Sequence, residues 1–206
     1  LFVAAAAMLL EHFTGALESY PKYGPALLGR GLSRDRLGDP YGALADYDAA
    51  VEQDAGIAER RYSRGVLRAR LGRNREARED LDAAIALDPR DVDAWVHRGA
   101  LSAVEGDVAG AVRDFDRAVE IEPGDVRARG CLEDALEVAV EASTEPDRSA
   151  YAAHLRDVRH PRPAAPSAAP TRIEVAPWLA WSIAALGAAS AATLVLLGPA
   201  YRLVRR

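Results

Sequence analysis

Three pairs of aspartates recur along this chain with one residue between the members of each pair: Asp46 and Asp48, Asp80 and Asp82, and Asp114 and Asp116. Paired carboxylates can bind a metal ion or act as a catalytic dyad. On an α-helix, however, residues two apart point about 200° away from each other. The spacing therefore does not favour a catalytic dyad or a metal site at these positions.

Other residues that could do chemistry are few. Cys131 is the single cysteine, which excludes an internal disulfide and a thiolate zinc site. The histidines show no metal-ligand spacing: His12, His97, His154 and His160. The sequence also lacks a nucleophile–base pair and a glycine-rich phosphate loop. We therefore predict no catalytic residue, no metal and no cofactor, and we do not expect an enzyme.

The elements that position the aspartates follow from a repeat of 34 residues. Residues 24–57, 58–91 and 92–125 stack without a gap, and the same residue types return at the same offsets. Each unit contains a turn glycine: Gly38, Gly72 and Gly106. The glycine divides its unit into two stretches with apolar residues three and four apart. This pattern predicts a hairpin of two closely packed helices in each unit.

An arginine precedes the first aspartate of each pair by sixteen residues: Arg30, Arg64 and Arg98. This separation places the arginine on the first helix of the hairpin and the aspartate on the second. We predict an ion pair across the helix contact within each unit.

These units resemble the tetratricopeptide repeat (TPR). That motif has a small residue at position 8, alanines at 20 and 27, an aromatic residue at 24 and proline at 32. In the third unit Gly99, Phe115 and Pro123 match three of these positions, and Trp95 matches the tryptophan of the motif. In the first unit Ala55 replaces the proline. The resemblance implies an all-α TPR helix-hairpin solenoid.

The repeat phase predicts the elements at both ends of the array. Residues 24–57, 58–91 and 92–125 are TPR 1, TPR 2 and TPR 3, and residues 1–23 match the second helix of a partial N-terminal repeat. An alternative for Leu1–Leu10 is the apolar part of a secretory signal. Residues 126–142 predict a capping helix with one apolar and one acidic face, on which Cys131 is a small buried apolar residue.

Residues 143–174 are predicted to be a Pro/Ala-rich linker, although residues 147–158 could form a short helix. The segment Val175–Ala200 carries no charge and is longer than a bilayer core requires. We predict a transmembrane helix at 175–201 and a basic tail at 202–206, and the alternative is a buried helix of a soluble domain. Gly187 and Ala191 have a spacing that permits a homodimer through this helix, but the abundance of alanine explains it as well.

We predict that the protein is located in a membrane, which it crosses once, and that residues 175–201 contact the lipid bilayer. The arginines of the tail favour a cytoplasmic C-terminus. A tail-anchored protein with its repeats in the cytosol is the alternative, because Arg162 and Arg172 lie on the other side of the segment.

The resemblance also implies where a partner binds, because TPR proteins use the concave face lined by the first helices. The candidate groove residues are Leu28, Leu32, Asp35, Arg36, Tyr62, Val66, Ala69, Arg70, Val96 and Ala100. Related chaperone adaptors hold a peptide carboxylate with asparagines at positions 6 and 9, and neither is asparagine in any unit here. We expect an apolar peptide or helix instead, with Arg36 and Arg70 meeting an acidic group.

Charge argues against nucleic acid as the partner. The chain has a formal net charge of −5. Arginines are dense between Arg60 and Arg78, but acidic residues lie among them. This pattern favours a salt-bridged surface over a phosphate-binding one.

The predicted function is a membrane-anchored scaffold or adaptor for protein–protein interaction, whose protein or peptide partner the sequence does not identify. The alternative is a C-terminal regulatory and membrane-tethering part of a larger enzyme or receptor.

Overall fold

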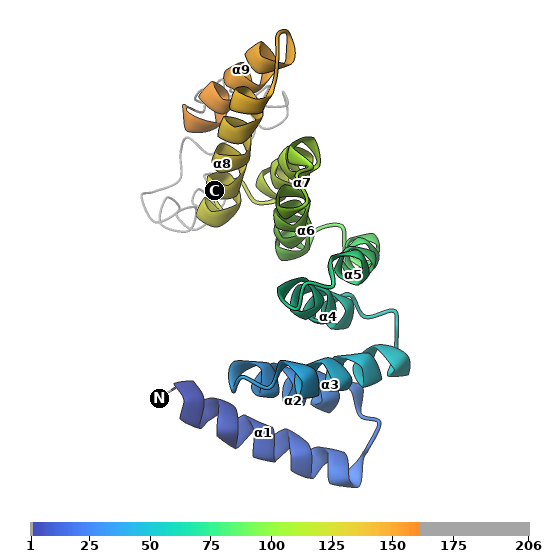
Figure 1. Ribbon diagram of the computed structural model, residues 1–206. Coiled ribbons are helices and arrows are strands. Elements are labelled where there is room, and N and C mark those ends of the chain that lie inside the picture. The colour runs from blue at the N-terminus through green and yellow to red at the C-terminus, as the bar shows by residue number, and fades with distance from the viewer. Residues whose placement is uncertain (1, 161–206) are drawn as a thin grey trace, which may run out of the picture. The chain divides into compact units, whose positions relative to one another are not determined.

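A computed structural model describes residues 2–160, and every regular element in this range is a helix. The helices are α1 (Phe2–Ser19), α2 (Gly24–Arg36), α3 (Pro40–Gln53), α4 (Ala58–Arg70), α5 (Asn74–Leu87), α6 (Val92–Val104), α7 (Val108–Ile121), α8 (Val126–Ala142) and α9 (Asp147–Arg159). Helices α2 and α3, α4 and α5, and α6 and α7 pack as hairpins that follow one another along the array (Figure 1). The described residues therefore form an all-α solenoid of helix hairpins, as predicted.

The predicted turn glycines close the three hairpins. Gly38, Gly72 and Gly106 have φ of 84°, 74° and 83°. These are left-handed backbone conformations that glycine adopts without steric cost. After Gly38 and Gly106, the side chains of Asp39 and Asp107 accept hydrogen bonds from backbone N–H groups of the next helix. Each hairpin turn is thus specified by residues that the repeat places there.

Small residues let the two helices of a hairpin approach closely. A Cβ atom added to Gly31 would lie 2.5 Å from the ring of Tyr47, and one added to Gly99 would lie 2.8 Å from Phe115. These rings come from the second helix of the same hairpin. Tyr47 and Phe115 are buried, with 2% and 4% exposure. The small residue at position 8 and the aromatic residue at position 24 are therefore two halves of one contact.

The predicted Arg–Asp pairs are present in all three hairpins. Arg64 donates from Nε and Nη2 to the two oxygens of Asp80, at 2.8 and 2.6 Å. Arg30 and Arg98 bind Asp46 and Asp114 in the same bidentate way. The aspartates are buried. The pairs therefore confirm the predicted contact across each hairpin.

The same arginines also join neighbouring hairpins. Arg64 donates to Asp48 of the preceding unit at 3.0 Å, and Arg98 donates to Asp82 of the preceding unit at 2.7 Å. In the second unit Arg68 adds bonds to both Asp80 and Asp48. We call this set of contacts the Arg–Asp ladder: Arg30, Arg34, Asp46, Asp48, Arg64, Arg68, Asp80, Asp82, Arg98 and Asp114. The second aspartates of the first two pairs, Asp48 and Asp82, therefore serve the interface between units, which the sequence analysis did not anticipate.

Helix α8 packs on α7, and α9 packs on α8. Tyr151, Leu155 and Val158 of α9 contact the buried cluster formed by α6, α7 and α8. The predicted linker of residues 143–174 therefore contains a packed helix over Asp147–Arg159. At this end Asp116 lies 3.0 Å from His154 Nε2, because Leu132 occupies the position at which the earlier units have arginine.

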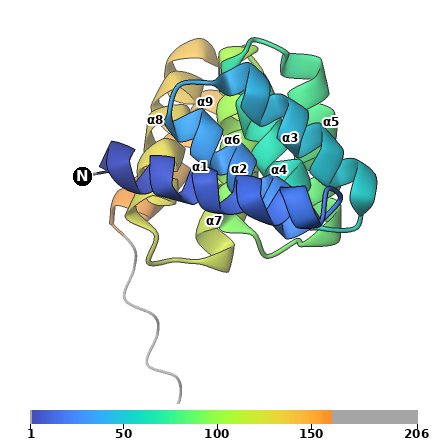
Figure 2. The ribbon, with the colours of Figure 1, turned by 90° about the horizontal axis from the view of Figure 1, so that it is seen from below.

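At the other end α1 packs on α2 (Figure 2). The ring of Phe13 lies within 2.4 Å of where a Cβ atom on Gly29 would stand. Leu17 is buried with Ala26, Leu27 and Ala50. Helix α1 thus covers α2 at the N-terminal end of the array.

Within residues 2–160, no helix has the length and apolar character needed to cross a membrane. The predicted transmembrane helix at 175–201 and the basic tail at 202–206 lie outside the described residues.

Replacement of Asp80 by alanine tests the ladder. The change leaves Arg64 and Arg68 with fewer partners in a site where their side chains are only 13% and 16% exposed. Breaking a buried pair from one side costs about 3 kcal/mol. We expect a clear fall in melting temperature, measured by circular dichroism.

Asp82→Ala is the matched control, because the Asp82 side chain is 52% exposed and pairs with Arg98 alone. Its expected cost is below about 1 kcal/mol. An Asp80→Ala variant that melts at the parent temperature would show that the ladder does not stabilise the array.

Candidate binding face

Two of the predicted groove residues belong to the core. Leu28 is 7% exposed and packs with Leu44, Tyr47 and Leu67. Val96 is 5% exposed and lies in the cluster built by α6, α7 and α8. Their side chains are not accessible to a partner. The repeat period did not reveal how deeply these two residues are packed.

The middle of the predicted groove is half-buried. Tyr62, Val66 and Ala69 of α4 pack against the buried residues Ala77, Leu81 and Leu101. The Tyr62 ring meets the His97 ring edge-on, with 5.4 Å between the centroids. His97 Nδ1 lies 2.8 Å from the carbonyl oxygen of Asp93 and so donates its proton there. These residues support the array, and their outer edges contribute to its surface.

The charged groove residues are arranged differently from the prediction. Arg70 donates to Asp35 at 2.7 Å, so its charge is already matched by a carboxylate of the array. The expectation that Arg70 is available for an acidic group of a partner is therefore not supported. Arg36 is exposed and lines a hollow with Val3, Ala6 and Leu9 of α1.

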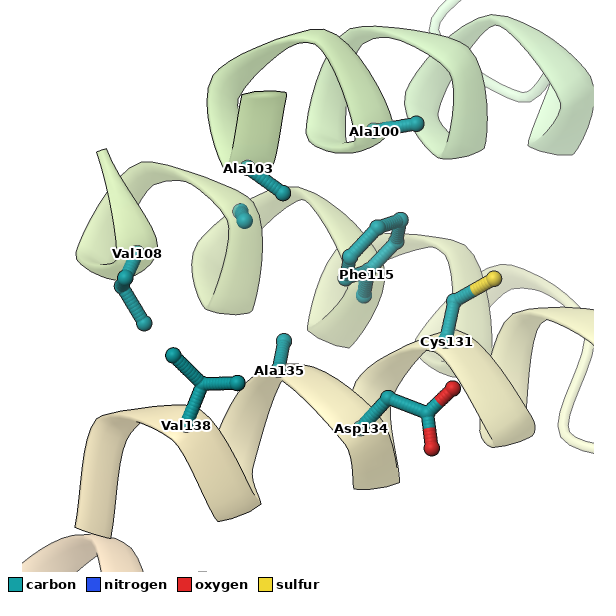
Figure 3. Close-up of a pocket in the computed structure, with 9 residues that line it drawn as sticks. Ala100, Ala103, Val108, Phe115, Cys131, Asp134, Ala135 and Val138 are labelled. Carbon is teal, nitrogen blue, oxygen red and sulfur yellow. The ribbon is translucent and has the colours of Figure 1, made fainter. Parts of the chain in front are cut away.

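Ala100 is exposed and opens onto a pocket of about 320 Å³ between α6, α7 and α8. The lining residues are Ala100, Ala103, Val108, Ala111, Phe115, Cys131, Asp134, Ala135 and Val138. Figure 3 shows Val108 of α7 and Val138 of α8 facing each other across it. Phe115, Ala111 and Ala135 are buried in its floor, whereas Val138 is 50% exposed at its rim. We call this the α6–α8 pocket.

The polar groups of the α6–α8 pocket are Cys131 and Asp134. Burial raises the pKa of the Cys131 thiol, and the negative charge of Asp134 raises it further. The thiol therefore remains protonated at neutral pH and is not an activated nucleophile. Asp134 is exposed at the rim. The pocket can accommodate an apolar side chain beside a carboxylate.

Most of the pocket residues were not among the predicted site residues. The prediction stopped at the third unit, but α8 carries the next set of first-helix positions: Cys131, Asp134 and Val138 are related to His97, Ala100 and Val104 by the 34-residue period. Extending the predicted groove positions by one unit would have identified Asp134 and Val138, because they correspond to Ala100 and Arg70. Among residues 2–160, no group of three or more His, Cys, Asp or Glu is arranged to hold a metal ion.

Comparisons with known proteins agree with this architecture. Residues 62–126 match the tetratricopeptide repeat family model. No curated protein sequence matches the chain.

Several solved structures are similar in fold. The crystal structure of MamA has a TM-score of 0.62 at 22% identity, over 73% of this chain and 84% of that chain. MamA 41-end from Desulfovibrio magneticus RS-1 has a TM-score of 0.63 at 17% identity, over 75% and 84%. The first TPR of Spaghetti (RPAP3), bound to an HSP90 peptide, has a TM-score of 0.54 at 23% identity, over 56% and 91%. Together with the repeat match over residues 62–126, these similarities support a TPR fold.

Alkaline unfolding tests the packing of Tyr62. Burial and the nearby carboxylates of Asp93 and Asp91 raise its pKa from 10.0 to about 12. Below pH 10 the phenol is protonated in both states. Between pH 10 and 12 the unfolded chain loses this proton first, so stability falls as the pH rises.

Tyr62→Phe should therefore lose less stability than the parent between pH 10 and 12, measured by urea unfolding at the two pH values. Tyr20→Phe is the control, at a tyrosine that is 71% exposed. An equal alkaline loss in Tyr62→Phe and the parent would contradict the buried environment of this ring.

Proposed function

We propose that this protein is a membrane-anchored interaction module, whose TPR array binds a peptide or helix of a partner protein and carries out no chemistry. The observation that carries the proposal is the exposed apolar surface on the first helices. Ala100, Ala103 and Val104 of α6 are exposed, with Val104 at 79%, and they continue into the α6–α8 pocket. Apolar surface of this kind, beside a preformed pocket, is typical of peptide-binding sites.

The comparisons support the binding of peptides as a use of this fold. In the solved structure, the first TPR of Spaghetti is bound to an HSP90 peptide. The present chain lacks the asparagines with which related adaptors hold a peptide carboxylate, because Ser63 and Val66 occupy those positions in the second unit. We therefore propose a partner peptide that is held by its side chains and not by its terminal carboxylate.

A single alanine tests the binding face. Ala100→Arg places a long charged side chain on the exposed surface of α6 and should remove the partners that depend on this face. Ala86→Arg is the matched control, at an exposed alanine of α5. Arginine is a good helix former, so both variants should fold. Proximity labelling of the membrane-embedded protein compares the partners, and identical lists for the two variants would contradict the proposed face.

The anchor is proposed from the uncharged segment Val175–Ala200. Its length favours a single span at 175–201, and the arginines of the tail favour a cytoplasmic C-terminus. The full chain should float with liposomes and resist alkaline carbonate extraction, whereas a chain that ends at residue 174 should do neither. Release of the full chain by carbonate would favour a buried helix in place of a span.

The span also provides a proposed route to a homodimer. Gly187 and Ala191 would lie on one face of the helix and permit close pairing. Gly187→Leu should reduce crosslinking between copies in membranes, and unchanged crosslinking would contradict this dimer.

A further inference from the structure

The α6–α8 pocket exists because one residue departs from the repeat. Leu67, Leu101 and Ala135 are related by the 34-residue period. Leu67 is 1% exposed and fills the space beside Ala43, Leu44 and Tyr47. Leu101 is 5% exposed and fills the same space beside Ala77 and Leu81. Where these leucines fill the core of the array, the smaller Ala135 leaves room beside Ala111 and Phe115.

A second departure lies at the rim of the same pocket. Leu32, Val66 and Ala100 are apolar, but the residue at the corresponding place in α8 is Asp134. Its neighbours Glu133 and Glu137 are already paired with Arg159 of α9. Within the described part of the chain, Asp134 makes no ion pair or side-chain hydrogen bond. Helix α8 thus combines an open apolar space with the unpaired carboxylate of Asp134.

From these two departures we infer that the α6–α8 pocket binds a partner peptide through one bulky apolar side chain with a lysine or arginine next to it. This inference rests on the proposed function and specifies the chemistry of the partner. The apolar side chain enters the space above Phe115 and Ala135, where its burial removes apolar surface from water. The basic side chain reaches the carboxylate of Asp134 at the rim and forms a charge-assisted hydrogen bond.

Charge complementarity distinguishes this partner from an acidic one. An aspartate or glutamate beside the apolar anchor would lie next to Asp134 and be repelled. The only arginine of the predicted groove residues that no described carboxylate matches is Arg36, and it lies at the opposite end of the array in α2. The pocket therefore selects a peptide with a basic residue. The sequence analysis had expected an acidic group at this face, which carries the opposite charge.

The test uses the full chain of residues 1–206 in lipid nanodiscs and a phage-displayed library of random dodecamer peptides. The parent should enrich peptides with a leucine, methionine or aromatic residue adjacent to lysine or arginine. Asp134→Lys should reverse this preference and enrich an acidic residue at the adjacent position. An unchanged sequence preference in Asp134→Lys would overturn the role of the carboxylate.

Ala135→Leu tests the apolar space without a risk to the fold, because leucine already occupies this place in the second and third units. The variant should melt at or above the parent temperature. It should bind the selected peptides roughly tenfold or more weakly, since a mismatch of even one methylene in an apolar pocket has such an effect. Unweakened binding by Ala135→Leu would overturn the inference.

The outcomes separate this inference from the proposed function. If Ala135→Leu keeps the selected peptides while Ala100→Arg loses them, the array binds peptides over the surface of α6 but not through the apolar space beside Ala135. If the parent enriches no peptide, both the inference and peptide binding by the array fail. Cys131, the single cysteine, provides a direct check. A peptide in the pocket should slow its alkylation by N-ethylmaleimide, and an unchanged rate would overturn the inference.

Discussion

The array depends on the neutralisation of carboxylates that its own packing buries. Asp46, Asp80 and Asp114 are 3%, 2% and 6% exposed, and an isolated charge at such a depth would destabilise the fold strongly. The bidentate arginine from the facing helix removes this penalty, and it does so in one geometry only. In the second and third units the same arginine, Arg64 or Arg98, also reaches the preceding unit, so it couples the register of the hairpin to the stacking of the units. Each unit of the solenoid therefore depends on its neighbour for polar as well as apolar contacts.

The Arg–Asp ladder ends at α8, the helix that also lines the α6–α8 pocket. Leu132 replaces the arginine of the earlier units and is buried, so Asp116 contacts His154 of α9 instead. Asp134 and Ala135 follow directly in α8. Three changes within four residues thus convert an internal stacking position into a terminal one. The terminal helix pair closes the core, and Ala135 leaves the space of the α6–α8 pocket beside Ala111 and Phe115.

Part of the binding face could be predicted and part could not. A helical period states which side chains share a face, and on this basis Ala100 and Arg36 were correctly expected at the surface. The depth of a residue depends on the volume of the side chains opposite, which a single sequence does not state. Leu28 and Val96 were for this reason assigned to the surface although they are buried. The partner of Arg70 was missed because Asp35 belongs to another unit.

The sequence by itself determined the period, the hairpins, the turn glycines and the Arg–Asp pairs within each hairpin, because these depend on residues close in the chain and on a pattern that repeats three times. Only the tertiary structure decided which interactions cross between units and where space remains. The bridges from Arg64 to Asp48 and from Arg98 to Asp82 require the stacking angle of successive hairpins. The pocket requires both the small side chain of Ala135 and walls supplied by α6 and α7, and a void arises only from several elements packed together.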